Sequence, residues 1–599
     1  MQKILDKIDI SEINNLYQLF CSRVHRSAEK DAYHYYDDDT KSWKTHSWSQ
    51  MADHVARWQH ALKNENLSPG DRVGIMVNNC PEWVMFEQAA LGLGLVVIPL
   101  YTNDRADNVC YIIGDAGIKL LFIQGEVQWS QLKEGCEKQN SLNKVITHQQ
   151  VSDPNEHVIH INNWLPDSAR RFPLAELNVH GSSLATIVYT SGTTGRPKGV
   201  MLSHHNILWN ADSGTDSIEI YASDSFISFL PLSHMFERSI GYYLPMLCGS
   251  IVNYARSIEH LAEDLITIQP TVMITVPRIF ERVYNKINAQ LTQKSPVARF
   301  LFNSAVNVGW NRFQYQQGKT GWHPSLIFYP ILYALVGKKI MAKLGGRMRL
   351  AVSGGAPLAG DIAKTFIGLG LTISQGYGMT ELSPVVSTNK LNDNEPTSVG
   401  QALRDIDIKL GENDELCVRS PGVMLGYWNN EGATKNIIDD DGWLHTGDKA
   451  KITKEHIYIT GRIKEILVLS NGEKVPPADI EMALANDPLI EQSMIIGEQK
   501  PFLAAILVFN EEEWNKLAKQ LNINATPNNL DSEIVKKYTL ERIKQHLNDF
   551  PGYANIYQIK IILEPWTVEN SMLTPTLKLK RREIQRRYQD DIAKLYEGH

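Results

Sequence analysis

The segment Tyr189–Val200, which reads YTSGTTGRPKGV, constrains the fold and the chemistry of this chain more than any other part of the sequence. The residues before it, Leu184–Val188 (LATIV), are apolar and partly β-branched, which predicts a strand. The segment itself combines glycines with hydroxyl side chains and two cations, namely Gly192, Gly195, Gly199, Thr190, Ser191, Thr193, Thr194, Arg196 and Lys198. Glycines allow the backbone N–H groups of a loop to converge, and such concavities bind phosphate.

The alternative for this segment is a solvated connector without a ligand. Its density of hydrogen-bond donors and positive charge favours the phosphate site instead. The segment is not a Walker A loop, whose pattern is GxxxxGK[ST], because Pro197 stands five residues after Gly192. The sequence therefore predicts a strand that opens into a different kind of phosphate-binding loop.

The size and charge of the chain exclude several classes of protein. A chain of 599 residues is too long for one hydrophobic core and should divide into domains. The net charge of −7 argues against broad nucleic-acid binding. The six cysteines form no CxxC pair, so zinc and disulfides are poorly supported and a reducing compartment fits better.

The N-terminus and the apolar runs favour a cytoplasmic protein. The first fifteen residues carry charges throughout, which argues against a secretory signal. No continuous apolar run approaches the ~20 residues that a membrane-spanning helix needs. The runs Ala89–Tyr101 and Leu326–Val336 are expected to be core elements. A membrane-surface patch remains the alternative for the second run, so peripheral contact at the inner membrane face stays open.

The alternation of elements predicts an α/β fold with two domains. Apolar strand-like runs alternate with amphipathic helical patterns through much of the first 400 residues, which is typical of layered, largely parallel sheets. From Gly411 to Arg462 the pattern changes to short strands and turns. We place the boundary at Gly461–Lys464, which gives a large N-terminal domain over residues 1–461 and a small α+β domain over residues 462–599.

Two further segments place polar groups beside glycines. Ser374–Glu381 reads SQGYGMTE, in which Tyr377 lies between two glycines and a hydroxyl adjoins a carboxylate at Thr380 and Glu381. Ser353–Leu358 reads SGGAPL. Each segment taken alone is typical of a turn. An oxygen ligand such as Glu381 also suits Mg²⁺, which prefers one or two carboxylates together with substrate phosphate oxygens.

Together, Tyr189–Val200 and Ser374–Glu381 resemble the phosphate loop and the adenine and magnesium motif of the adenylate-forming superfamily, which includes the AMP-forming acyl-CoA synthetases. Members of this superfamily activate a carboxylic acid with ATP, release pyrophosphate and pass the acyl group to a thiol. The resemblance therefore implies ATP, Mg²⁺ and CoA. It also implies a large N-terminal domain followed by a smaller, mobile C-terminal domain.

The resemblance implies the nucleotide site residue by residue. The phosphate loop supplies Thr190, Ser191, Gly192, Thr193, Thr194, Gly195 and Lys198, and the adenine pocket contains Gly354, Gly355, Ala356, Pro357, Tyr377 and Gly378. Within the adenine and magnesium motif, Tyr377 stacks on adenine, Thr380 contacts the α-phosphate region and Glu381 holds Mg²⁺. In Trp443–Asp448 (WLHTGD), which otherwise indicates a capped turn, Asp448 accepts hydrogen bonds from the ribose hydroxyls.

The C-terminal part carries the remaining implied residues. Arg462 contacts ribose or phosphate, and Lys464 is the hinge about which the small domain moves. In Thr574–Arg582 (TPTLKLKRR), Lys578 takes the place of the mobile catalytic lysine, and Lys580 is a minor rival because Thr576-Leu577 departs from the common SGKxxR form. A basic cluster of this kind is otherwise typical of a solvated helix face.

Four segments resemble the long-chain branch in particular. They are Phe226–Arg238, Thr275–Ile287, Lys343–Leu358 and the Thr574–Arg582 tail, and the resemblance extends from about residue 20 to about residue 590. It implies a long-chain fatty acid, ATP and CoA as partners, and no nucleic acid. An acyl tunnel should be apolar because each buried CH₂ contributes about 0.8 kcal/mol. The tunnel candidates are Met235, Phe236, Tyr242 and Tyr243, with His234 at the entrance or simply packed.

Two other functions stay open at this point. The acyl group could pass to a carrier-protein phosphopantetheine or remain as the adenylate, and a product assay with and without each thiol would decide this. A non-catalytic nucleotide-binding or lipid-binding regulator is the second alternative. It would be expected to lack the chemical groups that the chain retains at Glu381, Asp448, Arg462 and Lys578. The oligomeric state does not follow from the sequence.

Overall fold

The computed structural model describes residues 3–152, 157–175, 179–190, 196–471, 473–548, 550–568, 570–574 and 578–597, with the side chains of Lys464 and Tyr553 left aside. The chain divides into two compact units. The first contains Met1–Val276, Pro296–Ile408 and Val418–Leu444, and the second contains Pro277–Ser295, Lys409–Cys417 and His445–His599. The α/β fold class is confirmed, with a larger N-terminal part and a smaller C-terminal part.

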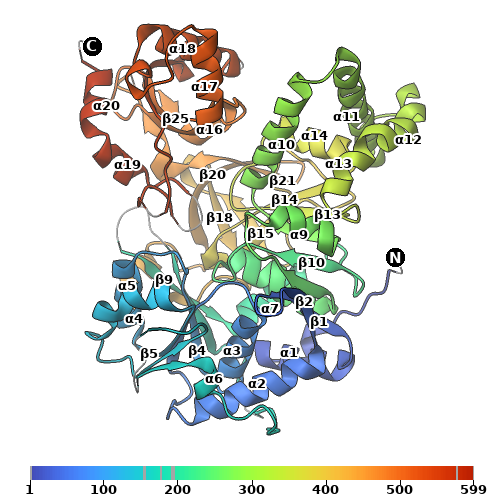
Figure 1. The fold of residues 1–599 in the computed structure, drawn as a ribbon, viewed down its shortest axis with the longest axis vertical. Helices are drawn as coiled ribbons and strands as arrows, with labels where there is room; N and C mark the ends of the chain where they lie inside the picture. The colour runs from blue at the N-terminus through green and yellow to red at the C-terminus, as the bar shows by residue number, and fades with distance from the viewer. Residues whose placement is uncertain are drawn as a thin grey trace. The chain divides into compact units, whose positions relative to one another are not determined.

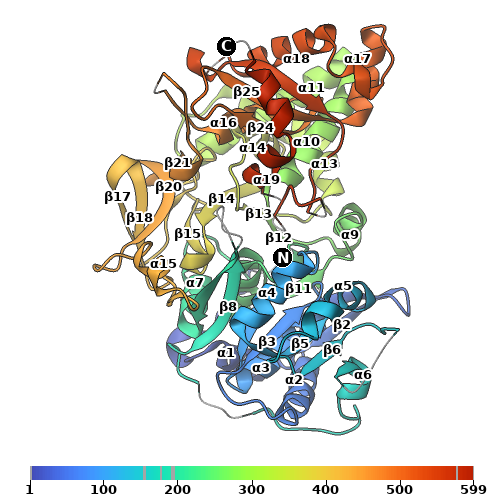
Figure 2. The same cartoon turned by 90° about the vertical axis from the view of Figure 1, so that its left-hand side faces the viewer.

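The first unit contains two large sheets, drawn in Figure 1 and Figure 2. The nine-stranded sheet consists, from edge to edge, of β16 (Gln401–Ala402), β15 (Val385–Thr388), β14 (Thr372–Gly378), β13 (Leu350–Ser353), β12 (Val272–Thr275), β10 (Ser225–Ser228), β11 (Ile251–Tyr254), β1 (Asp31–Asp37) and β2 (Ser42–Ser47). The eight-stranded sheet consists of β19 (Gly426–Tyr427), β9 (Lys198–Ser203), β8 (Leu184–Thr190), β4 (Val96–Pro99), β3 (Arg72–Met76), β5 (Ile118–Ile123), β6 (Lys144–Thr147) and β7 (Val158–His160). Their central strands are parallel, as predicted, and antiparallel strands lie at the edges.

Helices cover both faces of the eight-stranded sheet (Figure 2). The helices of the first unit are α1 (Leu16–Ser27), α2 (Trp48–Lys63), α3 (Pro81–Gly92), α4 (Ala106–Ala116), α5 (Glu126–Cys136), α6 (Ile161–Trp164), α7 (His204–Gly214), α8 (Leu244–Cys248), α9 (Leu261–Ile268), α11 (Pro296–Gln316), α12 (Tyr329–Leu332), α13 (Lys338–Lys343), α14 (Gly360–Gly368) and α15 (Glu431–Lys435). Alternate residues of β5 enter different cores: Leu120 and Phe122 pack with α2 and α3, and Leu121 and Ile123 pack with α4 and α5. This alternation follows from the two-residue period of a strand.

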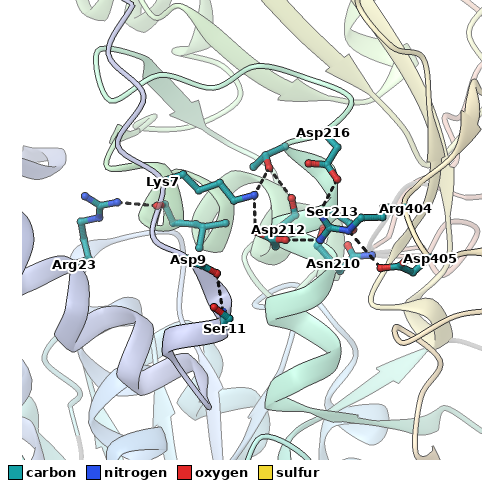
Figure 3. Close-up of polar contacts among 12 residues, drawn as sticks. Lys7, Asp9, Ser11, Arg23, Asn210, Asp212, Ser213, Asp216, Arg404 and Asp405 are labelled. Carbon is teal, nitrogen blue, oxygen red and sulfur yellow. Dashed lines mark hydrogen bonds and ion pairs between the residues drawn. The ribbon is translucent and has the colours of Figure 1, made fainter.

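The polar cluster of Figure 3 fixes α7, which directly follows β9, within the first unit. Ser203 caps the helix in a reciprocal arrangement with Asn206, which satisfies two backbone donors at its start. Near the other end, the buried Asp212 accepts from Lys7 at 2.6 Å and from Arg404 at 2.5 Å. Arg404 also pairs with Asp216 at 2.8 Å. A buried carboxylate with two cationic partners therefore ties the N-terminal segment and the segment after β16 to the same helix.

The second unit is built around a three-stranded sheet with the order β24 (Ile490–Ile496), β25 (Leu503–Phe509) and β26 (Ile556–Ile562). All seven residues of β25 are buried, and alternate residues enter two separate cores. The helices of this unit are α10 (Pro277–Thr292), α16 (Pro477–Leu484), α17 (Glu511–Gln520), α18 (Glu533–His546), α19 (Arg581–Arg587) and α20 (Gln589–Leu595). Its smaller strands are β22 (Leu467–Val468) and β23 (Lys474–Val475).

A four-stranded sheet with the order β17 (Asp407–Leu410), β18 (Glu415–Arg419), β20 (Leu444–Thr453) and β21 (His456–Arg462) accounts for the change of pattern after Gly411. The division between the two units falls within these strands, after Ile408 in β17, after Cys417 in β18 and after Leu444 in β20. The domain boundary expected between residues 461 and 462 does not coincide with a boundary of the compact units, and it stays a prediction.

The two apolar runs behave differently. Ala89–Tyr101 is largely buried, as expected for a core element. The expectation of a core element is wrong for Leu326–Val336, because Ile327 is 66% exposed and Ile331 is 60% exposed. The helical segment Pro324–Lys343 is long and apolar enough, by length and composition alone, to cross a membrane, and only 11% of its apolar window is buried.

Candidate active site

The predicted phosphate loop connects two antiparallel strands. β8 ends at Thr190 and β9 begins at Lys198, and these two residues are opposite each other in the register. Glycine is required at Gly199, since a Cβ there would lie 2.7 Å from the side chain of Ile187. The strand before the loop is thus as predicted. Ser191, Gly192, Thr193, Thr194 and Gly195 lie outside the described residues, so their phosphate contacts stay a prediction.

Tyr427 connects this hairpin to the predicted magnesium ligand. It lies in β19, which pairs with β9 so that Tyr427 is opposite Val200. The Lys198 Nζ atom lies 4.9 Å from the centre of the Tyr427 ring. On its other side the Tyr427 hydroxyl donates a hydrogen bond of 2.8 Å to Oε1 of Glu381. One tyrosine therefore joins the end of the phosphate loop to a carboxylate that follows β14 of the other sheet.

The environment of this pair is largely closed to water. Glu381 is 8% exposed and lies in the short 3₁₀ helix η5 (Thr380–Leu382), and its backbone carbonyl accepts from the Met424 amide at 2.9 Å. Burial, and then the negative charge of Glu381, raise the pKa of the Tyr427 hydroxyl well above its usual value. Tyr427 consequently remains a neutral donor to the carboxylate across the physiological pH range.

The two glycine segments follow neighbouring parallel strands. β13 ends at Ser353 immediately before Gly354, and β14 extends to Gly378 just before Thr380. Because carboxyl ends of parallel strands meet at one edge of a sheet, the two segments lie at the same edge, where ligands bind in open α/β sheets. Gly355, Ala356 and Pro357 are exposed there, and Gly355 has a φ of +82°, which favours glycine.

The glycines beside Tyr377 allow a close approach of two backbone segments. Tyr377 itself is half-buried. A Cβ on Gly376 would lie 2.8 Å from the carbonyl oxygen of Ser387, and one on Gly378 would lie 2.1 Å from that of Pro384. The glycines therefore permit the backbone of β14 to approach β15 and the residues before it.

In the second unit the structure brings Asp448 and Arg462 together. They are opposite each other in the β20–β21 register, and the Arg462 Nε atom donates to Asp448 Oδ1 at 2.9 Å. Asp448 is 4% exposed, and its amide donates to the Thr446 hydroxyl at 3.1 Å. The register thus fixes a carboxylate beside a guanidinium group, and the ribose contacts of the two residues stay a prediction.

The two candidate lysines of the tail differ in their surroundings. Lys578 is exposed, and its backbone exchanges hydrogen bonds with Thr574. Lys580 is half-buried at the N-cap of α19, where its amide donates to the Met572 carbonyl at 2.8 Å. Lys578 therefore has the greater reach into solvent. Lys464 lies in the 3₁₀ helix η7 (Ile463–Glu465), and its hinge role stays a prediction.

Comparison with known proteins identifies the family. The AMP-binding enzyme family matches residues 20–428, and the AMP-binding enzyme C-terminal domain matches residues 464–599. The chain belongs to the AMP-binding enzyme family.

Within this family of AMP-binding enzymes, the chain is similar to long-chain-fatty-acid–CoA ligase 5 of Rattus norvegicus, with 30% identity over 94% of this chain and 86% of the relative. It is also 29% identical to the long-chain-fatty-acid–CoA ligase FadD15 of Mycobacterium tuberculosis, over 92% of each chain. The resemblance to the adenylate-forming superfamily and its long-chain acyl-CoA synthetase branch is thus confirmed.

Solved structures of AMP-binding enzymes share the fold. The adenylation domain of a carboxylate reductase from Mycobacterium chelonae has a TM-score of 0.76 and 19% identity, covering 97% of this chain and 91% of that one. The anthranilate CoA ligase AuaEII in complex with anthranoyl-AMP has a TM-score of 0.73 and 18% identity, covering 98% of this chain and 100% of that one. At these identities the likeness concerns the fold alone.

The predicted acyl-pocket residues of this AMP-binding enzyme are mostly buried. Met235, Tyr242 and Tyr243 are 0% exposed, whereas His234 is half-buried and accepts from the Phe236 amide at 3.3 Å. Phe236 lies against Gly354, where a Cβ would meet its ring at 3.0 Å, so this one pocket candidate adjoins the predicted adenine segment.

The two tyrosines instead belong to a buried polar cluster. They lie in the π-helix η2 (Glu237–Tyr243), and the Tyr242 hydroxyl accepts from Gln88 at 2.5 Å. Arg238 pairs with Glu87 beside them, with both side chains fully buried. Burial raises the pKa of both tyrosines well above the usual value. Whether they also line an acyl tunnel stays a prediction.

Sequence reasoning missed Tyr427 as part of the site. Its segment, Gly426–Trp428, indicated only a short strand. The link from Tyr427 to Glu381 depends on the pairing of β19 with β9 across more than 200 residues, and nothing local to the segment reveals that pairing. The sequence signal that could have pointed to Tyr427 as a site residue is an aromatic residue directly after a glycine, which is weak because it is common in short strands and turns.

Proposed function

We propose that this AMP-binding enzyme is a long-chain-fatty-acid–CoA ligase. In the first half-reaction a carboxylate oxygen of the fatty acid attacks the α-phosphorus of ATP, and the bond to pyrophosphate breaks. In the second, the sulfur of CoA attacks the acyl carbon, the bond to AMP breaks and the thiol proton is released. The observation that carries this proposal is the similarity to long-chain-fatty-acid–CoA ligases over 92–94% of the chain.

We propose that Glu381 holds Mg²⁺ in this reaction. A buried carboxylate with one oxygen engaged by Tyr427 keeps oxygen lone pairs for a cation, and Mg²⁺ is bound by one or two carboxylates plus substrate phosphates. When bound, the ion would neutralise charge on the triphosphate. Lys198 and the donors of residues 190–195 would add positive charge and hydrogen bonds to the same phosphates, and Thr380 would contact the α-phosphate region.

The remaining roles divide between nucleotide binding and catalysis. Gly354, Gly355, Ala356, Pro357, Tyr377 and Gly378 would form the adenine pocket, and Asp448 and Arg462 would bind ribose. Lys578 would stabilise the charge that develops during adenylation. We propose that rotation about Lys464 then exchanges the adenylation state for a thioester-forming state, since such domain motions commonly separate two steps at one site.

A panel of acids with two thiols tests the proposed function. AMP release is measured with lauric, palmitic and oleic acid, with acetate and with benzoate, each with CoA, with an acyl carrier protein and without a thiol. We expect ATP- and CoA-dependent AMP release with the long-chain acids. Activity confined to acetate or benzoate would contradict the proposal, and activity with the carrier protein alone would favour the carrier alternative.

The substrate also suggests where the enzyme works. Long-chain acids partition into bilayers because each CH₂ transferred from water gains about 0.8 kcal/mol. We therefore propose a cytoplasmic enzyme that makes peripheral contact with the inner membrane face.

A further inference from the structure

Exposed apolar side chains concentrate in one short part of the chain. Eight of the seventeen large hydrophobic side chains that are exposed among the described residues lie between Val297 and Leu335. Four of them, Ile327, Phe328, Ile331 and Leu335, follow the helical path from the 3₁₀ helix η3 (Pro324–Phe328) through α12 to the π-helical turn η4 (Tyr333–Gly337). We call these four residues the α12 face. Their exposed fractions are 66%, 59%, 60% and 48%, so this face is open rather than part of a core.

The opposite side of the same helical path packs within the first unit. Tyr329 stacks on Tyr333 with ring centres 5.8 Å apart, and the Arg312 guanidinium of α11 lies 4.4 Å from the Tyr329 ring. Gly337 is buried, and a Cβ there would lie 2.9 Å from the Leu369 carbonyl after α14. α12 therefore lies beside α11 (Figure 1). One side of the helical path packs against the protein and the other is exposed. A helix fixed in this way lies on the protein and does not extend freely enough to span a bilayer.

The sequence on either side of this face carries charges of a single sign. Residues 282–360 contain eleven lysines and arginines and neither aspartate nor glutamate, in a chain whose net charge is −7. Every fourth residue from Ile327 to Lys343 is exposed. The first three of these residues are the apolar Ile327, Ile331 and Leu335, and the last two are Lys339 and Lys343. Lys338 is exposed as well. The apolar face thus ends in a lysine cluster, formed by Lys338, Lys339 and Lys343.

We propose that the α12 face and this lysine cluster dock on an anionic lipid bilayer, with the helical path lying in the interface. Apolar side chains on one face would enter the headgroup boundary, as in interfacial amphipathic helices. Each lysine near an anionic surface contributes attraction that decays within a Debye length, and its long stem allows the ammonium group to reach the phosphates. Docking itself requires no ligase activity, whereas its purpose, access to membrane-held fatty acid, rests on the proposed function.

Self-association is the other occupant that an apolar face suggests. In a two-fold dimer the same surface meets itself, so the lysines and arginines of this segment would enter an interface with a second, equally positive copy. The absence of acidic residues from 282–360 leaves this segment no negative partner for them. Charge complementarity therefore favours a negatively charged surface over a second copy.

Vesicle co-sedimentation of the full chain, without ATP or CoA, tests the proposal. The vesicles are phosphatidylcholine alone or phosphatidylcholine with phosphatidylglycerol, each at low and high salt. We expect binding to the anionic vesicles that weakens at high salt. The triple variant Lys338→Ala/Lys339→Ala/Lys343→Ala should bind anionic vesicles at least tenfold more weakly. Ile327→Ser/Ile331→Ser/Leu335→Ser should bind them at least tenfold more weakly at both salt concentrations.

Matched controls replace equally exposed residues elsewhere. Lys63→Ala/Lys138→Ala/Lys519→Ala removes three exposed lysines, and Val127→Ser/Ile534→Ser removes exposed apolar side chains at 65% and 58% exposure. Both controls should bind like the unmodified chain, and thermal unfolding followed by circular dichroism shows that all variants are folded, independently of any ligase activity. The proposal would be overturned if the controls lost as much vesicle binding as the lysine and apolar variants of the α12 region. It would also be overturned if neither of those two variants lost binding, or if the unmodified chain did not bind anionic vesicles. A change of oligomeric state in the face variants with vesicle binding intact would overturn it in favour of self-association.

Discussion

At the scale of single residues, Tyr427 is the group whose removal tests how the site is held together. Tyr427→Phe keeps the ring beside Lys198 and removes only the donor to Glu381. Partners that orient a metal ligand typically contribute 10–100-fold to metal affinity or activity. We therefore expect about a tenfold increase in the Mg²⁺ concentration that gives half-maximal adenylation, measured by pyrophosphate release.

Tyr17→Phe is the matched control for this measurement. It removes a tyrosine hydroxyl that donates to the Ala175 carbonyl at 3.0 Å, outside the candidate site. Its Mg²⁺ dependence should equal that of the unmodified chain. If Tyr427→Phe lowered the rate while leaving the Mg²⁺ dependence unchanged, Tyr427 would not position the metal ligand.

Candidate site residues can be proposed from the sequence where a motif is contiguous, and not where the candidate depends on strand pairing. Glu381 and Asp448 stand inside short motifs, and the structure buries both beside a hydrogen-bonding partner. Of their hydrogen-bonding partners, Arg462 could be proposed from the sequence and Tyr427 could not. Arg462 has its own resemblance to the family, but Tyr427 acquires its role only through the register of β19 on β9.

At the scale of elements, local signals determined boundaries well where tertiary packing agreed with them. The sequence predicts a helix from Pro81 to Gly92, and this helix is α3, which has proline in its first turn and eleven buried residues of twelve. The sequence also predicts a helix at Pro477–Ala485, and this helix is α16, one residue shorter. The run Leu326–Val336 was misjudged because apolar composition alone does not distinguish a core helix from an exposed one.

The close approach of β14 to the Pro384 segment gives a prediction at this scale. Gly378→Ala would place a Cβ 2.1 Å from the Pro384 carbonyl oxygen, and backbone cannot yield as a flexible side chain can. We expect destabilisation by about 1–3 kcal/mol, the usual cost of overpacking. The control is Gly432→Ala in α15, where no atom lies within 4 Å and helix propensity favours alanine by up to about 1 kcal/mol. Calorimetric unfolding should separate the two variants, and equal transitions would contradict the steric argument.

At the scale of the whole molecule, the chain order divides the candidate groups of the site between the two compact units. Thr190, Lys198 and Glu381 belong to the first compact unit, and Asp448, Arg462 and Lys578 belong to the second. The sequence predicted two domains from the change of pattern after Gly411, but it could not predict that α10 clusters with the C-terminal unit. Such a contact is set by tertiary packing, and the helix itself carries no signal of it.

This separation predicts that Lys578 serves only one half-reaction. Lys578→Ala should slow adenylation at least ~10²-fold, the scale of losing one electrostatic stabiliser, because its ammonium would no longer face the developing charge. Thioester formation from supplied acyl-adenylate and CoA should be retained, since a mixed anhydride needs no further activation at phosphorus.

Lys580→Ala is the matched control, because Lys580 is half-buried at the start of α19 and should affect neither step strongly. Pyrophosphate release and acyl-CoA formation are measured separately. An equal fall in both for Lys578→Ala, or a selective loss of adenylation for Lys580→Ala instead, would transfer the catalytic role away from Lys578.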